Sequence, residues 1–87
     1  MTSETDDVVD AILSIVAAYG NLSIEMSSLS YDEDLFRAGM TSYASVQVML
    51  ELERRFGIEF PEDMLRQSTF ESVSSIRSAV SGLLIKS

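Results

Sequence analysis

The 87-residue sequence contains neither cysteine nor histidine. These absences exclude a disulfide framework, a Cys- or His-ligated zinc site, and the Ser–His–Asp and Cys–His arrangements of nucleophilic enzymes. The single lysine, Lys86, is the penultimate residue and a poor candidate for a Schiff base. Carboxylate pairs such as Glu51 and Glu53 are better explained as solvated helix faces than as glycosidase residues. We therefore expect a protein without catalytic residues of its own, not an enzyme.

Basic residues are few: six Lys and Arg stand against 14 Asp and Glu, and the net charge is −8. Because such a surface repels phosphate backbones and anionic lipids, we expect neither a nucleic-acid partner nor membrane binding. Residues 1–41 carry eight of the acids and a single base, Arg37. No basic segment followed by an apolar run is present, as a signal peptide would show, and no apolar run approaches the roughly 20 residues that span a bilayer, so we expect a cytoplasmic protein.

Proline occurs once and glycine four times, while apolar residues make up 46% of the chain. This composition is typical of neither disordered nor fibrous proteins. A chain of this length buries only about 60% of its unfolded surface, so its core is small. We expect one domain over residues 1–87, present as a monomer.

Helical periodicity marks two long segments. Residues 6–19 place Val8 and Ile12 at helical spacing, with acids at the start and Gly20 at the end. Residues 42–56 place Val48, Leu52 and Phe56 at i, i+4 and i+8, and Gly57 ends this helix. The intervening residues 21–41 lack sustained periodicity but contain regular apolar residues. We expect a long loop pinned across the core, with one short helical turn near residues 35–37.

Helix start signals recur in the last third of the chain. Pro61, followed by two acids, predicts a short helix with Met64 and Leu65 facing inward. Ser68-Thr69 is then expected to cap a last helix with apolar residues at near-helical spacing. No alternating strand pattern occurs. The sequence predicts an all-α fold: a small four-helix bundle, with three main helices, a short third helix and a long loop between helices one and two.

Ser42 is one of fifteen serines and opens the second long helix. The first N–H groups of a helix lack internal partners, so a phosphate attached there is well accommodated. The alternative is that Thr41 or Ser42 simply caps the helix. Local sequence alone favours the cap, because this is the usual role of Ser and Thr at helix starts.

The wider pattern favours modification. Residues 34–61 read Asp-Leu-Phe-Arg-Ala-Gly-Met-Thr-Ser, then Leu-Glu-Arg-Arg-Phe-Gly-Ile-Glu-Phe-Pro after an intervening helical stretch. This pattern resembles the acyl carrier protein family, in which Asp-Leu-Phe-x-x-Gly-x-x-Ser precedes helix two. The resemblance covers about residues 5–84. It implies that a phosphopantetheinyl transferase attaches 4′-phosphopantetheine from coenzyme A to Ser42, and that the terminal thiol of this arm holds cargo as a thioester.

Departures from the family pattern indicate a subgroup of the family. Thr41 and Tyr43 replace the usual Asp and Leu around the serine, and Arg54 and Arg55 make helix two less acidic than in fatty-acid carriers. With Phe-Pro-Glu-Asp-Met-Leu and Thr-Phe-Glu-Ser-Val, the sequence is similar to stand-alone bacterial aminoacyl carrier proteins. That similarity implies an amino acid:carrier protein ligase resembling a truncated seryl-tRNA synthetase. Acyl-transfer enzymes of fatty-acid or polyketide synthesis are the alternative partners.

One edge of helix two carries Val46, Leu50 and Arg54 at i, i+4 and i+8. It is either part of a wide core stripe or a contact patch. We predict a partner-docking surface formed by Met40, Thr41, Tyr43, Val46, Leu50 and Arg54. Two other functions compete: an unmodified helical adaptor whose serine only caps a helix, and calcium binding at residues 32–34. The calcium site is disfavoured because the twelve-residue loop pattern, with its central Gly and terminal Glu, is absent.

Overall fold

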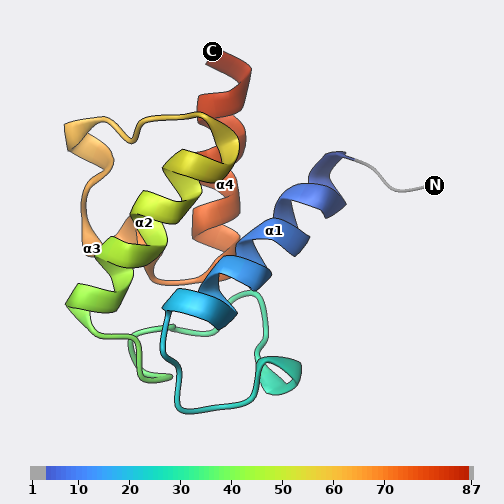
Figure 1. Cartoon of the computed structure of the whole chain (residues 1–87), viewed down its shortest axis with the longest axis vertical. Coiled ribbons are helices and arrows are strands. Elements are labelled where there is room, and N and C mark those ends of the chain that lie inside the picture. The colour runs from blue at the N-terminus through green and yellow to red at the C-terminus, as the bar shows by residue number, and fades with distance from the viewer. Residues whose placement is uncertain (1–3, 87) are drawn as a thin grey trace.

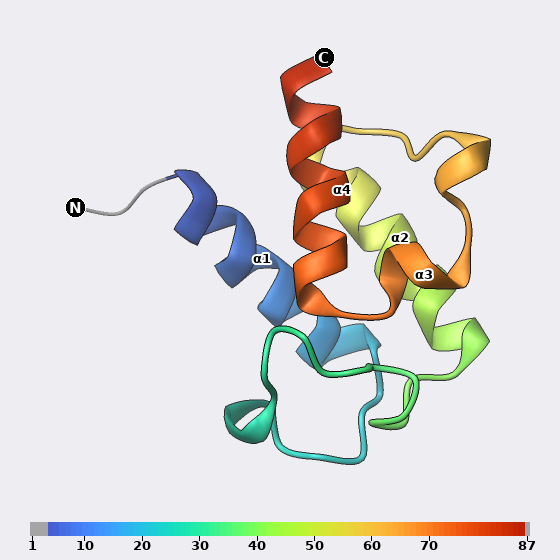
Figure 2. The same cartoon turned by 180° about the vertical axis from the view of Figure 1, so that it is seen from behind.

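The computed structural model describes residues 4–86, with side chains described for residues 7–85. The elements are α1 (Glu4–Tyr19), the 3₁₀ turn η1 (Met26–Ser28), α2 (Ser42–Phe56), the 3₁₀ turn η2 (Glu62–Met64), α3 (Gln67–Phe70) and α4 (Val73–Lys86). No strand occurs within this described part, which confirms the predicted all-α fold. Figure 1 shows the loop between α1 and α2 at the end of the bundle where α2 begins, and Figure 2, seen from behind, shows α4 nearer the viewer than α2.

The two long helices begin and end close to the predicted residues. α1 starts at Glu4, two residues before the predicted start, and the side chain of Asp6 lies outside the described side chains. α2 spans the predicted residues 42–56. Gly57 ends α2 in a left-handed conformation with φ of 64°, and the next N–H, that of Ile58, donates to the Glu53 carbonyl at 3.1 Å. The predicted glycine stop is therefore confirmed.

The core is built from apolar pairs one turn apart on each long helix. Its most deeply buried side chains have relative exposures below 2% and come from all three long helices and the loop: Ile12, Val16, Leu35, Val48, Leu52, Val73, Ile76 and Val80. Phe60, which follows α2, packs edge-on against Phe70 of α3, with ring centroids 5.2 Å apart. The helical stripes predicted from sequence therefore form one hydrophobic cluster.

The long loop is pinned across this core, as predicted. Leu35 is fully buried, and its N–H donates to the Glu71 carbonyl at 2.7 Å. The Tyr31 carbonyl accepts a second bond, from the Ser74 N–H at 2.9 Å. Within the loop, the N–H of Ala38 donates to the Asp34 carbonyl at 3.1 Å, which forms the helical turn expected near residues 35–37, and η1 is a further turn that was not predicted. These bonds join the loop to the end of α3 and the start of α4.

Gly39 controls the approach of the loop to α2. Its φ of 116° is rarely adopted by residues with a side chain, and a Cβ atom there would lie 2.9 Å from the Ser23 backbone nitrogen. Ser23 is itself held in place, because its N–H and its hydroxyl both donate to the Ala38 carbonyl, at 2.8 and 2.9 Å. The contacts with Ser23 therefore hold the chain at Ala38 and Gly39, just before α2.

The prediction that Ser68-Thr69 caps the last helix is wrong. Residues 67–70 form the separate turn α3, and α4 begins at Val73. Ser72 and Ser75 exchange hydrogen bonds: the N–H of each donates to the other's hydroxyl oxygen at 3.1 Å, as in a capping box. The Glu71 carbonyl accepts the Leu35 N–H of the long loop, and the Ser75 N–H, which would bond to this carbonyl in a continuous helix, donates to the Ser72 hydroxyl instead. The helix therefore starts again after Ser72.

The segment after α2 also differs in detail from the prediction. Pro61 precedes the 3₁₀ turn η2 instead of occupying its first position. Met64 packs against the core, as expected, but Leu65 is 49% exposed, so the prediction that it faces inward is wrong. None of the helices in the described part of the chain is long and apolar enough to cross a membrane.

Candidate functional site

Thr41 is the residue that caps α2. Its backbone is extended, and its side-chain oxygen accepts a hydrogen bond from the Ala44 N–H at 3.0 Å. The Thr41 carbonyl accepts from the Ser45 N–H at 2.9 Å and so begins the helical hydrogen-bond series. Of the two capping candidates in the sequence, only Thr41 has the capping role. Ser42 is left as the first residue of the helix proper.

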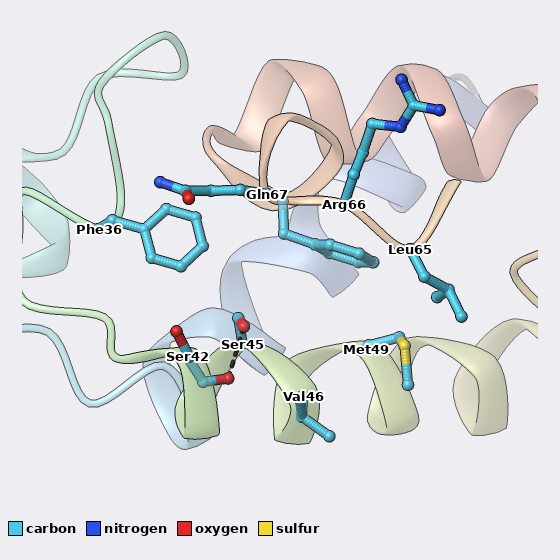
Figure 3. A pocket seen from close by; sticks show the side chains of 9 residues that line it. Phe36, Ser42, Ser45, Val46, Met49, Leu65, Arg66 and Gln67 are labelled. Carbon is cyan, nitrogen blue, oxygen red and sulfur yellow. Dashed lines mark hydrogen bonds between the residues drawn. The ribbon is translucent and has the colours of Figure 1, made fainter. Parts of the chain in front are cut away.

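The Ser42 hydroxyl is exposed and makes no hydrogen bond to any residue that the structure describes. Figure 3 shows this hydroxyl directed toward the ring of Phe36, while the Ser42 carbonyl accepts a bond from the Ser45 hydroxyl at 2.7 Å. No described residue accepts a hydrogen bond from the N–H groups of Ser42 and Tyr43, and the first turn of α2 contains no acidic residue. An anion bonded to Ser42 would therefore lie beside unpaired N–H donors.

A hollow of about 240 Å³ adjoins Ser42, between the first two turns of α2 and residues 65–70. Ser42, Phe36 and Gln67 surround one end in Figure 3, and Met49 and Leu65 lie at the other end. The complete lining is Phe36, Ser42, Ser45, Val46, Met49, Leu65, Arg66, Gln67 and Phe70. The sequence did not predict this hollow, because α3 and the loop residue Phe36 meet α2 only through the tertiary fold.

Several predicted docking residues share one exposed edge of α2. Tyr43 is 75% exposed, and Val46 and Leu50 are each 47% exposed. Arg54 continues the edge, with its side chain 76% exposed and 3.4 Å from the Glu51 carboxylate. The option that this edge belongs to a wide core stripe is therefore excluded for these side chains. Leu65 adds an exposed apolar group across the hollow that the sequence reasoning missed.

The prediction that Met40 belongs to the docking surface is wrong. Its side chain is only 2% exposed and belongs to the core cluster, because the turn at Gly39 directs it inward beneath the start of α2. Thr41 is exposed, but its side chain is already engaged in the cap. The exposed edge of the site therefore begins at Tyr43.

The acidic run at residues 32–34 has a local structural role. The Asp34 carboxylate accepts hydrogen bonds from the N–H groups of Phe36 and Arg37, at 2.9 and 3.3 Å. Across the described residues, no three acidic side chains are grouped so that they could hold a metal ion. These bonds stabilise the turn that leads into the site.

The residues at the start of α2 suit a phosphopantetheine group. Ser42 offers an exposed hydroxyl that no cap uses, and free N–H donors lie beside it. The adjoining hollow is lined at this end by the ring of Phe36 and the amide of Gln67. A phosphodiester at this oxygen would displace no existing interaction in the described structure.

Known proteins share this sequence and fold. A family model described as "Phosphopantetheine attachment site" matches residues 10–79. The aminoacyl carrier protein of Agrobacterium fabrum is 38% identical over 73 residues, which are 84% of this chain and 88% of that protein. D-alanyl carrier protein 2 of Lactiplantibacillus plantarum is 37% identical over 79 residues, 90% of this chain and 95% of the relative.

A solved structure shares the arrangement of helices. It is the crystal structure of an engineered Bradyrhizobium japonicum glycine:[carrier protein] ligase complexed with a carrier protein from Agrobacterium tumefaciens and AMP. The matching chain has a TM-score of 0.81 and 37% identity, over 84% of this chain and 97% of that one. The family match spans Ser42 and most of the chain. The chain therefore belongs to the phosphopantetheine attachment family of carrier proteins.

Proposed function

We propose that this protein is an aminoacyl carrier whose 4′-phosphopantetheine arm is bonded to the Ser42 side-chain oxygen. The proposal rests mainly on the different roles of Thr41 and Ser42 at the start of α2. Thr41 caps the helix through the bond to Ala44, while the exposed Ser42 hydroxyl has no partner in the described structure. The proposed site of action is the cytoplasm, with the protein as a monomer.

In the proposed attachment step, a phosphopantetheinyl transferase uses coenzyme A as donor. The Ser42 oxygen loses its proton and bonds to the phosphorus next to the pantetheine. The bond from this phosphorus to the adenosine bisphosphate part of coenzyme A breaks. The arm supplies the thiol that forms thioesters, and the protein supplies position and recognition. The N–H groups of Ser42 and Tyr43, which have no acceptor among the described residues, would stabilise the phosphodiester charge.

Two kinds of relative support an amino acid as cargo. One is named as an aminoacyl carrier and the other as a D-alanyl carrier, and both cover most of this chain. Two of the matching carrier structures contain a glycine:[carrier protein] ligase, with AMP in one and ATP in the other. We therefore propose an ATP-dependent amino acid:carrier protein ligase as the loading partner, related to a truncated seryl-tRNA synthetase. It would transfer the aminoacyl group to the arm thiol.

The proposed docking surface for this ligase is the exposed edge of α2, formed by Tyr43, Val46, Leu50 and Arg54. Three of these side chains are apolar and at least 47% exposed, and Arg54 supplies a positive charge at the far end. Transient interfaces need only a few such anchors with a charged rim. Tyr43 is adjacent to Ser42, so a partner seated on this edge would lie next to the arm.

Intact-mass measurement tests the attachment. Wild-type protein, Ser42→Ala and Ser45→Ala are incubated with coenzyme A and a broad-specificity phosphopantetheinyl transferase. Ser45 is the matched control, because it lies one turn further along α2 and lines the same hollow. Wild type and Ser45→Ala should each gain one phosphopantetheinyl group, and Ser42→Ala should gain none. If wild type gains no mass with any of several transferases, the unmodified adaptor becomes the better function.

Loading kinetics test the docking edge. Leu50→Ser should lower kcat/KM for loading of the arm-bearing protein by about fivefold or more, chiefly through KM, because it removes an exposed apolar anchor. The Bradyrhizobium glycine:[carrier protein] ligase is the probe enzyme. Ile85→Ser is the matched control, since Ile85 is 83% exposed near the end of α4. Equal effects of the two substitutions would place the docking surface elsewhere.

A further inference from the structure

A second hollow, of about 350 Å³, lies between α1 and α2, and we call it the α1/α2 groove. Its lining comes from both helices: Ser14, Ile15, Tyr19, Glu51, Arg54 and Arg55. Ile15 is buried, whereas Tyr19 is 41% exposed, and its hydroxyl makes no hydrogen bond to any residue that the structure describes. The groove therefore combines an apolar side chain, an aromatic ring and charged groups that solvent can reach.

The α1/α2 groove is positive in a protein that is otherwise acidic. Two arginines and one glutamate line it, whereas the whole chain has a net charge of −8. Because the Debye length is about 8 Å at physiological ionic strength, more distant exposed charges are largely screened from a group bound in the groove. The lining residues therefore decide which charge the groove attracts, and that charge is negative.

Arg55 is the lining cation without a partner in the described structure. Arg54 lies 3.4 Å from the Glu51 carboxylate, so these two charges engage each other. Arg55 is exposed and makes no hydrogen bond or ion pair with any residue that the structure describes. A guanidinium can bind a carboxylate through two parallel N–H bonds. One such cation suits a single carboxylate better than a nucleic-acid backbone, which presents many phosphates.

The α1/α2 groove lies on a different side of α2 from the hollow beside Ser42. Met49 lines that hollow together with residues of the 65–70 segment, whereas Glu51 and Arg55 line the groove together with α1. Arg55 is 13 residues beyond Ser42, or about 20 Å at the helical rise of about 1.5 Å per residue. Figure 1 shows α2 running away from the long loop. A group bound in the groove would therefore not cover Ser42.

We infer that the α1/α2 groove docks an acidic segment of a partner protein. One carboxylate of this segment pairs with Arg55, and a neighbouring apolar side chain packs against Ile15 and Tyr19. Arginine and tyrosine are residue types that contribute strongly to protein interfaces. A second copy of this chain is a poorer occupant, because two chains of net charge −8 repel each other. A partner held here would leave Ser42 accessible to another protein.

Two model peptides that differ in one charge test the docking. They are the acetylated, C-terminally amidated hexapeptides Ala-Leu-Glu-Ala-Leu-Ala and Ala-Leu-Gln-Ala-Leu-Ala. Each is titrated into the full chain, and ¹H–¹⁵N NMR follows the amides of Ile15, Tyr19 and Arg55. At low salt the Glu peptide should shift these amides and bind about threefold to fivefold more tightly than the Gln peptide. In 1 M NaCl, where the Debye length is about 3 Å, this preference should disappear. No shift with either peptide, or equal binding at low salt, would overturn the inference.

Substitutions locate the contact. Arg55→Gln should abolish the preference for the Glu peptide, whereas Arg37→Gln, which removes the same charge from an exposed loop residue, should retain it. Tyr19→Ser should weaken both peptides, and Tyr31→Ser, at a site 52% exposed in the loop, should weaken neither. If Arg55→Gln and Arg37→Gln had equal effects, net charge and not the groove would attract the peptide, and the inference would fail.

Two controls distinguish other occupants of the groove. Inorganic phosphate should not reproduce the shifts given by the Glu peptide. If it did, the groove would be a general anion site. The lining amides should also keep the same shifts as the protein is concentrated without peptide. Shifts that changed with protein concentration would make a second copy the occupant, and either result would overturn the inference.

Loading kinetics test whether Ser42 stays accessible, and this part alone rests on the proposed function. The arm-bearing protein is loaded by the Bradyrhizobium glycine:[carrier protein] ligase with and without a saturating concentration of the Glu peptide. The kcat/KM for loading should stay within about twofold. A decrease of about fivefold or more would contradict the separation of the two surfaces. If intact mass shows no arm on Ser42, the proposed function fails, while peptide binding still decides the docking.

Discussion

Replacing Thr41 with valine removes the oxygen that accepts the Ala44 N–H bond at 3.0 Å, while the β-branched shape of the side chain is kept. Loss of an N-cap costs about 0.5–2 kcal/mol, typically about 1 kcal/mol. For a chain of this size, 1 kcal/mol corresponds to a Tm decrease of about 4–8 °C. Thr41→Ser keeps the acceptor and should stay within about 0.5 kcal/mol of wild type. Urea denaturation followed by far-UV circular dichroism gives the free energies of unfolding.

Ser42→Ala is the informative comparison. Because its hydroxyl has no hydrogen bond in the described structure and is exposed, this substitution should change the free energy of unfolding by less than about 0.5 kcal/mol. Thr41→Val should still accept the arm, and Ser42→Ala should not. If Ser42→Ala destabilised the protein as much as Thr41→Val does, Ser42 would share the capping role. The assignment of Ser42 as an unengaged attachment residue would then be refuted.

Three further substitutions test what holds the site in place, and thermal unfolding measures each. Gly39→Ala should destabilise more than Gly57→Ala, because a Cβ atom at Gly39 meets backbone at 2.9 Å whereas none lies within 4 Å at Gly57; equal losses would contradict this. Leu35→Ala should cost about 2–5 kcal/mol as a fully buried leucine, and a loss below 1 kcal/mol would mean that the loop is not pinned. Glu53→Ala should lower the free energy of unfolding by about 1–3 kcal/mol, because the Phe60 N–H loses its 2.9 Å hydrogen bond. Glu53→Gln keeps an acceptor oxygen and should retain most of the wild-type stability.

The sequence predicted those parts of the fold that depend on local chemistry. The start and end of α2 follow from a cap residue, a 3.6-residue apolar repeat and a terminal glycine, all within residues 41–57. The start of α4 was mispredicted because the segment contains several adjacent hydroxyl residues. Ser72 was selected among them by its reciprocal bonds with Ser75 and by the bond from the distant Leu35 to Glu71.

The candidate site was likewise predicted only in part. Ser42 was selected by the family pattern of residues 34–61, and the edge at Val46 and Leu50 follows from positions along one helix. The burial of Met40 and the exposure of Leu65 depend on how the loop and η2 cross the core, which no local pattern encodes. The hollow likewise requires segments from three parts of the chain to meet. The hollow therefore depends on tertiary packing and could not be predicted from any one segment of the sequence.

The central claim is that Ser42 bears the arm that carries an amino acid. Trypsin cleaves after Arg37 and Arg54 and releases one peptide, residues 38–54, that contains Thr41, Ser42 and Ser45. Protein treated with coenzyme A and transferase, then with glycine, ATP and the ligase, is digested, and this peptide is fragmented in a mass spectrometer. The account predicts two successive mass increases, phosphopantetheinyl and then glycyl, both localised to Ser42. Modification at Thr41 or Ser45, or none, would contradict it.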